Sequence, residues 1–219
     1  FPTRRSSDLE QPGFNANVLE GVDSIPQVQR VESSRIRGLR LSNERPEVVL
    51  IARPINLGNP SRSLALIGPT VFPPHGSEKR VMVFGSEAMG DLYDWRAGQE
   101  ANLPLAAGAE QKVWVAGIFR DYGRQHGSVV IPIKDYEQLT GDLTRTHISV
   151  WLNEGTEPAP IIQAIQAQRP ELAHLKWVSA VDIRELSLKI FDRSFAMTYV
   201  LEGVALLVAL FSVAAGATG

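Results

Sequence analysis

Three residue types that can carry out acyl transfer lie close together in the middle of the chain. Asp121, His126 and Ser128 are separated by only a few residues. A serine nucleophile, a histidine base and an aspartate that orients the base form the triad of many hydrolases. The same short stretch also suits a polar hairpin loop between two strands, because it contains glycines and short polar side chains. We favour the loop interpretation and keep the hydrolase as an alternative.

The rest of the sequence offers no motif of catalysis or metal binding. It contains no G-x-x-x-x-G-K-[ST] phosphate loop, no H-E-x-x-H, no G-x-S-x-G and no G-x-G-x-x-G. His75, His147 and His174 are isolated and lack the spacing of metal ligands. Cysteine is absent, which excludes disulfides and cysteine-based zinc sites. We therefore predict a chain that is not an enzyme, with no catalytic residue, no metal and no cofactor of its own.

The overall composition is that of an ordinary globular protein. The chain has 219 residues, of which 44% are hydrophobic, and a formal net charge of −2. A near-neutral balance argues against a nucleic-acid binder, which needs a basic surface. The length allows one domain of ordinary size with a segment left over.

The N-terminal string FPTRRSSDL, residues 1–9, matches the in-frame translation of a common sequencing adapter. We predict that these residues are not part of the natural protein and exclude them from the fold. If this is correct, the natural chain begins upstream and the sequence is a fragment.

Residues 10–180 read as one α+β domain with a mixed sheet. Runs of β-branched and aromatic residues predict strands at 28–41, 48–55, 81–84, 101–105, 112–119, 128–131, 147–152 and 175–178. Helical patterns occupy 86–93, 132–139 and 158–168, the second beginning at Pro132. The last third then reads as a split β-α-β unit, which can stack one helix on a sheet.

The C-terminal part, residues 195–219, has the pattern of a transmembrane helix that is cut short. No charge occurs from Gly203 to Gly219, a length of roughly 25 Å against about 30 Å of hydrocarbon. A buried core helix is the competing interpretation, although such helices rarely lack charge on every face. We predict a membrane span here.

A stalk helix over residues 181–194 is expected to join the domain to this span without a flexible hinge. The segment lacks Pro and Gly and alternates apolar with charged residues. Glu185 and Lys189 have the favourable i, i+4 spacing. The charged side chains that we expect to couple the stalk to the domain are Asp182, Glu185, Lys189 and Arg193.

The predicted span carries one stripe of small residues. These are Ala205, Ala209, Ser212 and Gly216, which would let another helix approach closely. Composition alone is the alternative explanation, since alanine is frequent here. Glu202 either lies at the membrane interface, which we prefer, or makes a buried polar contact with a partner helix.

VFGSEAMGDLYDWRAGQEANLPLA (83–106) contains a W-x-x-G-x-x-x-x-L-P-L pattern. KVWVAGIFRDYGRQHGSVVIPIKDYEQLTG (112–141) contains V-x-G-I-x-R-D-Y-x-x-x-x-G. Both stretches resemble the extracytoplasmic domain of FtsX/MacB-type ABC transporter permeases, and 190–216 resembles the start of the transmembrane helix that follows this domain. The likeness covers most of residues 18–219, and the motifs are moderately specific.

The resemblance implies a permease subunit in a bacterial cytoplasmic (inner) membrane, with its main domain on the extracytoplasmic side. Such permeases work with a cytoplasmic ABC ATPase subunit, which binds the ATP, and with further transmembrane helices of the same chain in membrane lipid. Related systems export or release lipoproteins, lipids or other hydrophobic substrates. No nucleic-acid partner is expected.

Two different functions also fit the sequence. One is a single-pass sensor or adhesion domain that the C-terminal span anchors in the membrane. The second is a soluble hydrolase that uses Asp121, His126 and Ser128, with the apolar C-terminal segment buried in its core.

Overall fold

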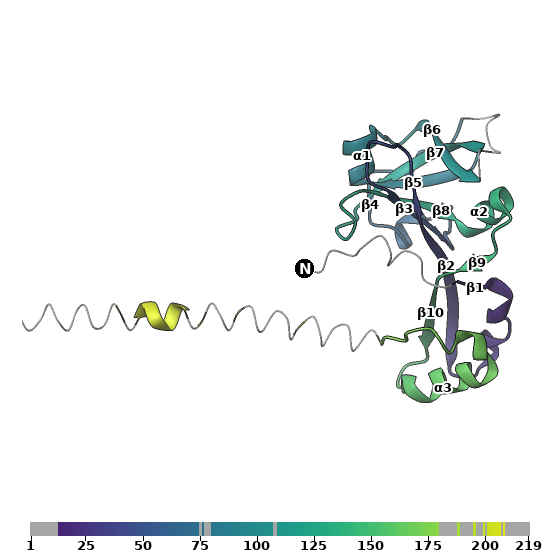
Figure 1. Ribbon diagram of the computed structural model, residues 1–219, viewed down its shortest axis with the longest axis vertical. Helices are drawn as coiled ribbons and strands as arrows, with labels where there is room; N and C mark the ends of the chain where they lie inside the picture. Colours follow the sequence, from purple (N-terminus) through teal and green to yellow (C-terminus); the bar gives the residue numbers. More distant parts are fainter. Residues whose placement is uncertain are drawn as a thin grey trace, which may run out of the picture.

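A computed structural model describes residues 13–74, 76, 80–106 and 109–179, and residues 188, 195, 199, 201–206 and 208 near the C-terminus. The strands are β1 (Phe14–Asn15), β2 (Val28–Leu39), β3 (Val48–Arg53), β4 (Leu66–Ile67), β5 (Met82–Ser86), β6 (Gln99–Ala106), β7 (Ala109–Phe119), β8 (Ser128–Pro132), β9 (Thr144–Arg145) and β10 (His147–Leu152). The helices are α1 (Glu87–Tyr93), α2 (Ile133–Thr140) and α3 (Pro158–Gln168), with 3₁₀ turns η2 (Ala16–Leu19), η3 (Val22–Ser24), η4 (Pro60–Arg62) and η5 (Pro170–Leu172) (Figure 1).

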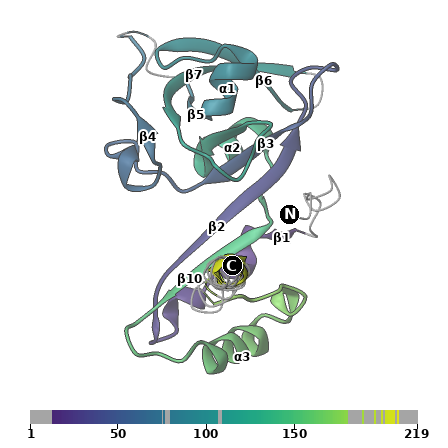
Figure 2. The same ribbon diagram turned by 90° about the vertical axis from the view of Figure 1, so that its left-hand side faces the viewer.

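The long strand β2 connects the two parts of the domain. Its first half, through Ser34, pairs with β10, and its second half, from Arg35, pairs with β3; both pairings are antiparallel. Figure 2 shows β2 running from the part that carries β10 and α3 into the curled part of the sheet. A single strand is therefore shared by both parts, which ties them together through the backbone.

The curled part of the sheet is mixed. Strand β3 pairs in parallel with β8, β8 pairs antiparallel with β5, and β5 pairs in parallel with β7. Strands β4 and β6 add to β7 in antiparallel fashion. The central strands read as VVLIAR and SVVIP, and such continuous apolar runs are typical of strands that are covered on both faces.

Alternating side chains divide this sheet between two hydrophobic cores. On one face Leu50, Val115 and Val129 pack with Met89 of α1 and Tyr136 of α2. The other face carries Ile51, Phe84, Trp114 and Val130, which pack with Leu64 from the loop that contains η4. The helices thus cover one face, and a loop covers only part of the other.

A third core lies around β10 and α3. Ile161 and Ile165 of α3 pack with Phe14, Val22 and Leu172, all of which are buried. Leu175 and Trp177 are partly buried against the same cluster. Residues near both ends of the described domain therefore belong to one core.

The predicted α+β class with a mixed sheet is confirmed, and most of the predicted strands and helices exist near their expected bounds. The predicted strand at 175–178, the second strand of the split β-α-β unit, is not formed. Its alternating apolar residues Leu175 and Trp177 pack against the third core and are partly buried there, but the backbone of this segment pairs with no described strand. Pro132 does not begin a helix but ends β8, where it pairs with Arg53 and precedes α2 with an extended ψ of 132°.

Candidate functional site

Asp121 organises the loop between β7 and β8. Its carboxylate accepts hydrogen bonds from Ser128 Oγ at 2.6 Å, from Arg124 Nη1 at 2.9 Å and from the Gly123 N–H at 3.1 Å. The Asp121 side chain is only 8% exposed. Burial raises the pKa of Asp121, but the bonds from Ser128 and Arg124, together with the Arg124 charge, outweigh it and hold this pKa below its usual value. The carboxylate is therefore ionised and structural.

The arrangement of Asp121, His126 and Ser128 is not that of a catalytic triad. Ser128 is fully buried, and its hydroxyl donates to Asp121 instead of facing a base. Its N–H donates to Ser86 Oγ at 2.9 Å, which fixes the start of β8. His126 is exposed, and within the described part of the chain no hydrogen bond joins it to Asp121 or Ser128. The cluster is a polar loop, as we favoured from the sequence, but it is not a hairpin, because β5 lies between β7 and β8 in the sheet.

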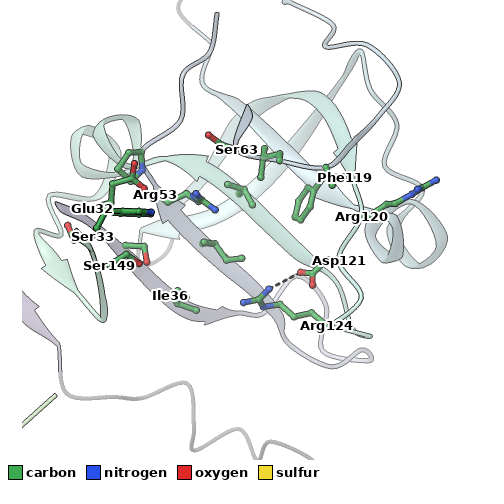
Figure 3. A pocket seen from close by; sticks show the side chains of 17 residues that line it. Glu32, Ser33, Ile36, Arg53, Ser63, Phe119, Arg120, Asp121, Arg124 and Ser149 are labelled. Atoms are coloured by element: carbon green, nitrogen blue, oxygen red, sulfur yellow. Dashed lines mark hydrogen bonds and ion pairs between the residues drawn. The ribbon is translucent and has the colours of Figure 1, made fainter. Parts of the chain in front are cut away.

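This loop forms one wall of a groove with a volume of about 390 Å³. The groove lies on the sheet face that the η4 loop covers only in part (Figure 3). Its floor contains the apolar residues Ile36, Ile51 and Val130. Around this floor stand polar side chains from both parts of the domain, which are Glu32, Ser34, Arg53, Arg124, Ser149 and Trp151. Such a mixed surface can hold an elongated partner.

A second polar cluster, which the sequence patterns did not reveal, ties α2 to the middle of β2. Asp142 Oδ2 accepts from Arg35 Nε at 3.2 Å and from the Tyr136 hydroxyl at 2.8 Å, while Oδ1 accepts from the Thr144 N–H at 2.8 Å. Gly141 positions Asp142, because it ends α2 with a φ of 68°. Burial raises the pKa of Asp142, yet the hydrogen bonds from Thr144 and Tyr136 and the Arg35 charge lower it to about 2.

Arg145 extends this cluster toward the other part of the domain. It is 5% exposed, forms an ion pair with Glu137 of α2 and donates from Nε to Ser33 Oγ at 3.2 Å. Burial and the hydrogen bond to Asp142 also raise the pKa of Tyr136, so its hydroxyl stays a donor at neutral pH. The available sequence signal was a set of charged residues inside or beside short strands, where charge is costly unless paired.

The predicted stalk and membrane residues fall mostly outside the described residues. This holds for the stalk residues Asp182, Glu185, Lys189 and Arg193 and for Ala209, Ser212 and Gly216 of the predicted span. Glu202 and Ala205 lie in a helical stretch over 201–206 and are exposed. Among the residues that could be searched, no helix has the length and apolar character needed to cross a membrane. The stalk, the span and their packing faces remain predictions.

No metal site is indicated in the described ranges. No group of three or more His, Asp or Glu side chains there is arranged to hold a metal ion. Asp121 and Asp142, the carboxylates with the most hydrogen bonds, are already surrounded by donors from the protein.

Comparisons with known proteins give likeness of structure and none of sequence. No protein-family model and no curated protein matches the chain. The periplasmic region of MacB from Actinobacillus actinomycetemcomitans superposes with a TM-score of 0.52 at 12% identity, covering 80% of this chain and 83% of that one. The extracellular domain of the noncanonic ABC-type transporter YknZ from Gram-positive bacteria gives a TM-score of 0.48 at 16% identity, covering 74% and 83%.

The likeness to MacB establishes a shared fold. It covers 80% of this chain and therefore takes in most of the folded domain. The predicted resemblance to extracytoplasmic domains of ABC-type permeases is thus confirmed at the level of fold.

Proposed function

We propose that the chain is a piece of the permease subunit of an ABC transporter, and that its folded domain lies on the extracytoplasmic side of a bacterial cytoplasmic membrane. The observation that carries this proposal is the fold shared with the periplasmic region of MacB. The motifs in 83–106 and 112–127 support it independently, because they were found without the structure. Fold alone does not imply function, so the two lines of support are needed together.

The position of the domain's ends also supports the proposal. Phe14, near the first described residue, and Trp177, near the last of the domain, contribute to the same hydrophobic core. The chain therefore enters and leaves the domain on one side. A domain inserted between two membrane spans requires this arrangement, whereas a domain with ends on opposite sides would need a long return connection.

In the proposed mechanism a separate ATPase supplies the energy. ATP binding by that partner would favour one of two arrangements of the membrane helices, and the stalk would carry the change to the domain. Asp182, Glu185, Lys189 and Arg193 are the proposed coupling residues, and Glu202, Ala205, Ala209, Ser212 and Gly216 the proposed contacts between membrane helices. The domain can move as one body, because β2 is common to both of its parts. Export or release of a lipoprotein, lipid or other hydrophobic substrate is the proposed outcome.

The natural gene provides the test. We expect the reading frame to continue beyond Gly219 into further hydrophobic spans and an ATPase gene to lie beside it. The tagged permease expressed from this locus should retain an ATP-hydrolysing subunit through purification, and a tagged unrelated membrane protein should not. A frame that ends soon after residue 219, with no ATPase retained, would support the single-pass sensor or adhesion domain instead.

A further inference from the structure

We propose that the groove beside the Asp121 loop binds an extended, acidic segment of a partner polypeptide. This inference goes beyond the proposed function and does not depend on it, because it rests only on the described side chains. The groove residues come from β2, β3, β8 and β10, from the segment after η4, and from the end of β7 and the loop that follows it.

The shape of the groove favours an elongated occupant. Residues Glu32, Ser34 and Ile36 alternate along β2 and therefore face the same side of the sheet. On the neighbouring strands Ser149 lies opposite Glu32, and Ile51 lies opposite Ile36. The stretch of β2 that lines the groove, from Glu32 to Ile36, is roughly 13 Å long at the rise of a β-strand. About four residues of extended polypeptide have this length.

The groove contains a positive charge that is unpaired among the described residues, which favours an anionic partner. Glu32 is already paired with Arg30 at 3.2 Å, and Asp121 is paired with Arg124 at 2.9 Å. Arg53 is half-buried and has no ion-pair or hydrogen-bond partner for its guanidinium among the described residues. Figure 3 shows its side chain at the groove. A carboxylate is the natural partner, since it can accept two parallel hydrogen bonds from one guanidinium.

The polar side chains along β2 and β10 favour a peptide over an acyl chain as the occupant of the groove. A hydrocarbon chain lying along β2 would cover the Ser34 and Ser149 hydroxyls and the Glu32 carboxylate without replacing their hydrogen bonds to water. A peptide backbone offers donors and acceptors at these positions and can place one apolar side chain on Ile36 and Ile51. Trp151, held by Arg30 at 3.9 Å from its ring centre, supplies the kind of rigid aromatic surface that is enriched in protein interfaces.

The test is selection from a random peptide library displayed on phage, with the full chain immobilised. We expect enriched peptides to combine acidic residues with an apolar anchor. A synthetic peptide of the most enriched sequence should bind the Arg53→Glu variant about tenfold or more weakly than the parent. Arg96→Glu is the matched control, since it makes the same charge change at an exposed residue outside the groove and should leave affinity unchanged. Circular dichroism confirms that each variant folds.

Trp151→Ala gives a second variant that keeps the test decisive if Arg53→Glu does not fold, and it too should weaken binding. Peptides enriched equally on the parent and on the groove variants, or enriched peptides that are basic, would overturn the proposal. So would Arg53-dependent binding of dodecanoate or of phosphatidylglycerol vesicles in the absence of any peptide binding, because the groove would then be a lipid site. None of these outcomes depends on an ATPase or a membrane, so they leave the proposed permease role to its own test.

Discussion

Arg35 Nε lies 3.2 Å from Asp142 Oδ2, at the residue where β2 stops pairing with β10 and begins to pair with β3. Asp142 is also held by Tyr136 of α2. One carboxylate therefore joins the helix layer to the strand that both parts of the domain share. The relative position of the two parts depends on side chains as well as on the continuous backbone of β2.

Asp142→Asn should lower the free energy of unfolding in a pH-dependent way. The folded pKa of Asp142 is about 2, below the ordinary value of 3.8. The ionised form thus stabilises the fold fully above pH 3.8, and the effect is lost as pH falls through the folded pKa. A shift of this size corresponds to about 2 kcal/mol at pH 7 and roughly half of that at pH 3. Urea unfolding of parent and variant at both pH values measures it, and a difference that stays constant would contradict this account.

Ser128→Ala and His126→Ala should have different effects, because only Ser128 supports the Asp121 carboxylate. Removing the buried hydroxyl that donates to Asp121 should cost about 1–2 kcal/mol of stability. His126 is exposed, so its replacement should change stability by less than about 0.5 kcal/mol. Thermal unfolding compares the two variants. The same proteins assayed with p-nitrophenyl acetate should show no shared loss of hydrolysis; a parallel loss in both variants would restore the triad.

Gly127→Ala should destabilise the loop more than Gly155→Ala. Both glycines have positive φ, 97° and 78°, so each substitution strains the backbone. A Cβ at Gly127 would lie 2.8 Å from Met89 Sδ, whereas a Cβ at Gly155 would meet nothing within 4 Å. We expect a loss of about 2–3 kcal/mol for the first and about 1 kcal/mol for the second. Equal losses in urea unfolding would show that the contact with α1 does not matter.

The sequence predicted the strands best where a short run is rich in β-branched residues. The stretches that became β3, β8 and β10 are of this kind, and each was placed to within two residues at either end. The strand predicted at 175–178 failed, because alternation reports which side chains are buried but not whether the backbone finds a ladder partner. A loop that packs on a core gives the same pattern as an edge strand.

The candidate site was only partly visible in the sequence. The Asp121 loop was found because its polar residues are close together along the chain. The groove and the Asp142 cluster join residues more than a hundred positions apart, such as Arg35 and Asp142, and no local pattern reports such a pairing. The twelve-residue strand β2 brings them together, and its division between two partners could not be read from its own residues.

Cysteine accessibility in spheroplasts tests the permease proposal most directly. The chain has no cysteine, so Ser61→Cys in the exposed η4 turn adds one accessible thiol to the natural permease, and Ala116→Cys adds a fully buried one as control. We predict that a membrane-impermeant maleimide labels the Ser61→Cys permease in intact spheroplasts, above the parent's background, while Ala116→Cys reacts only after denaturation. Labelling of Ser61→Cys only after the spheroplasts are lysed would place the domain in the cytoplasm and contradict the account.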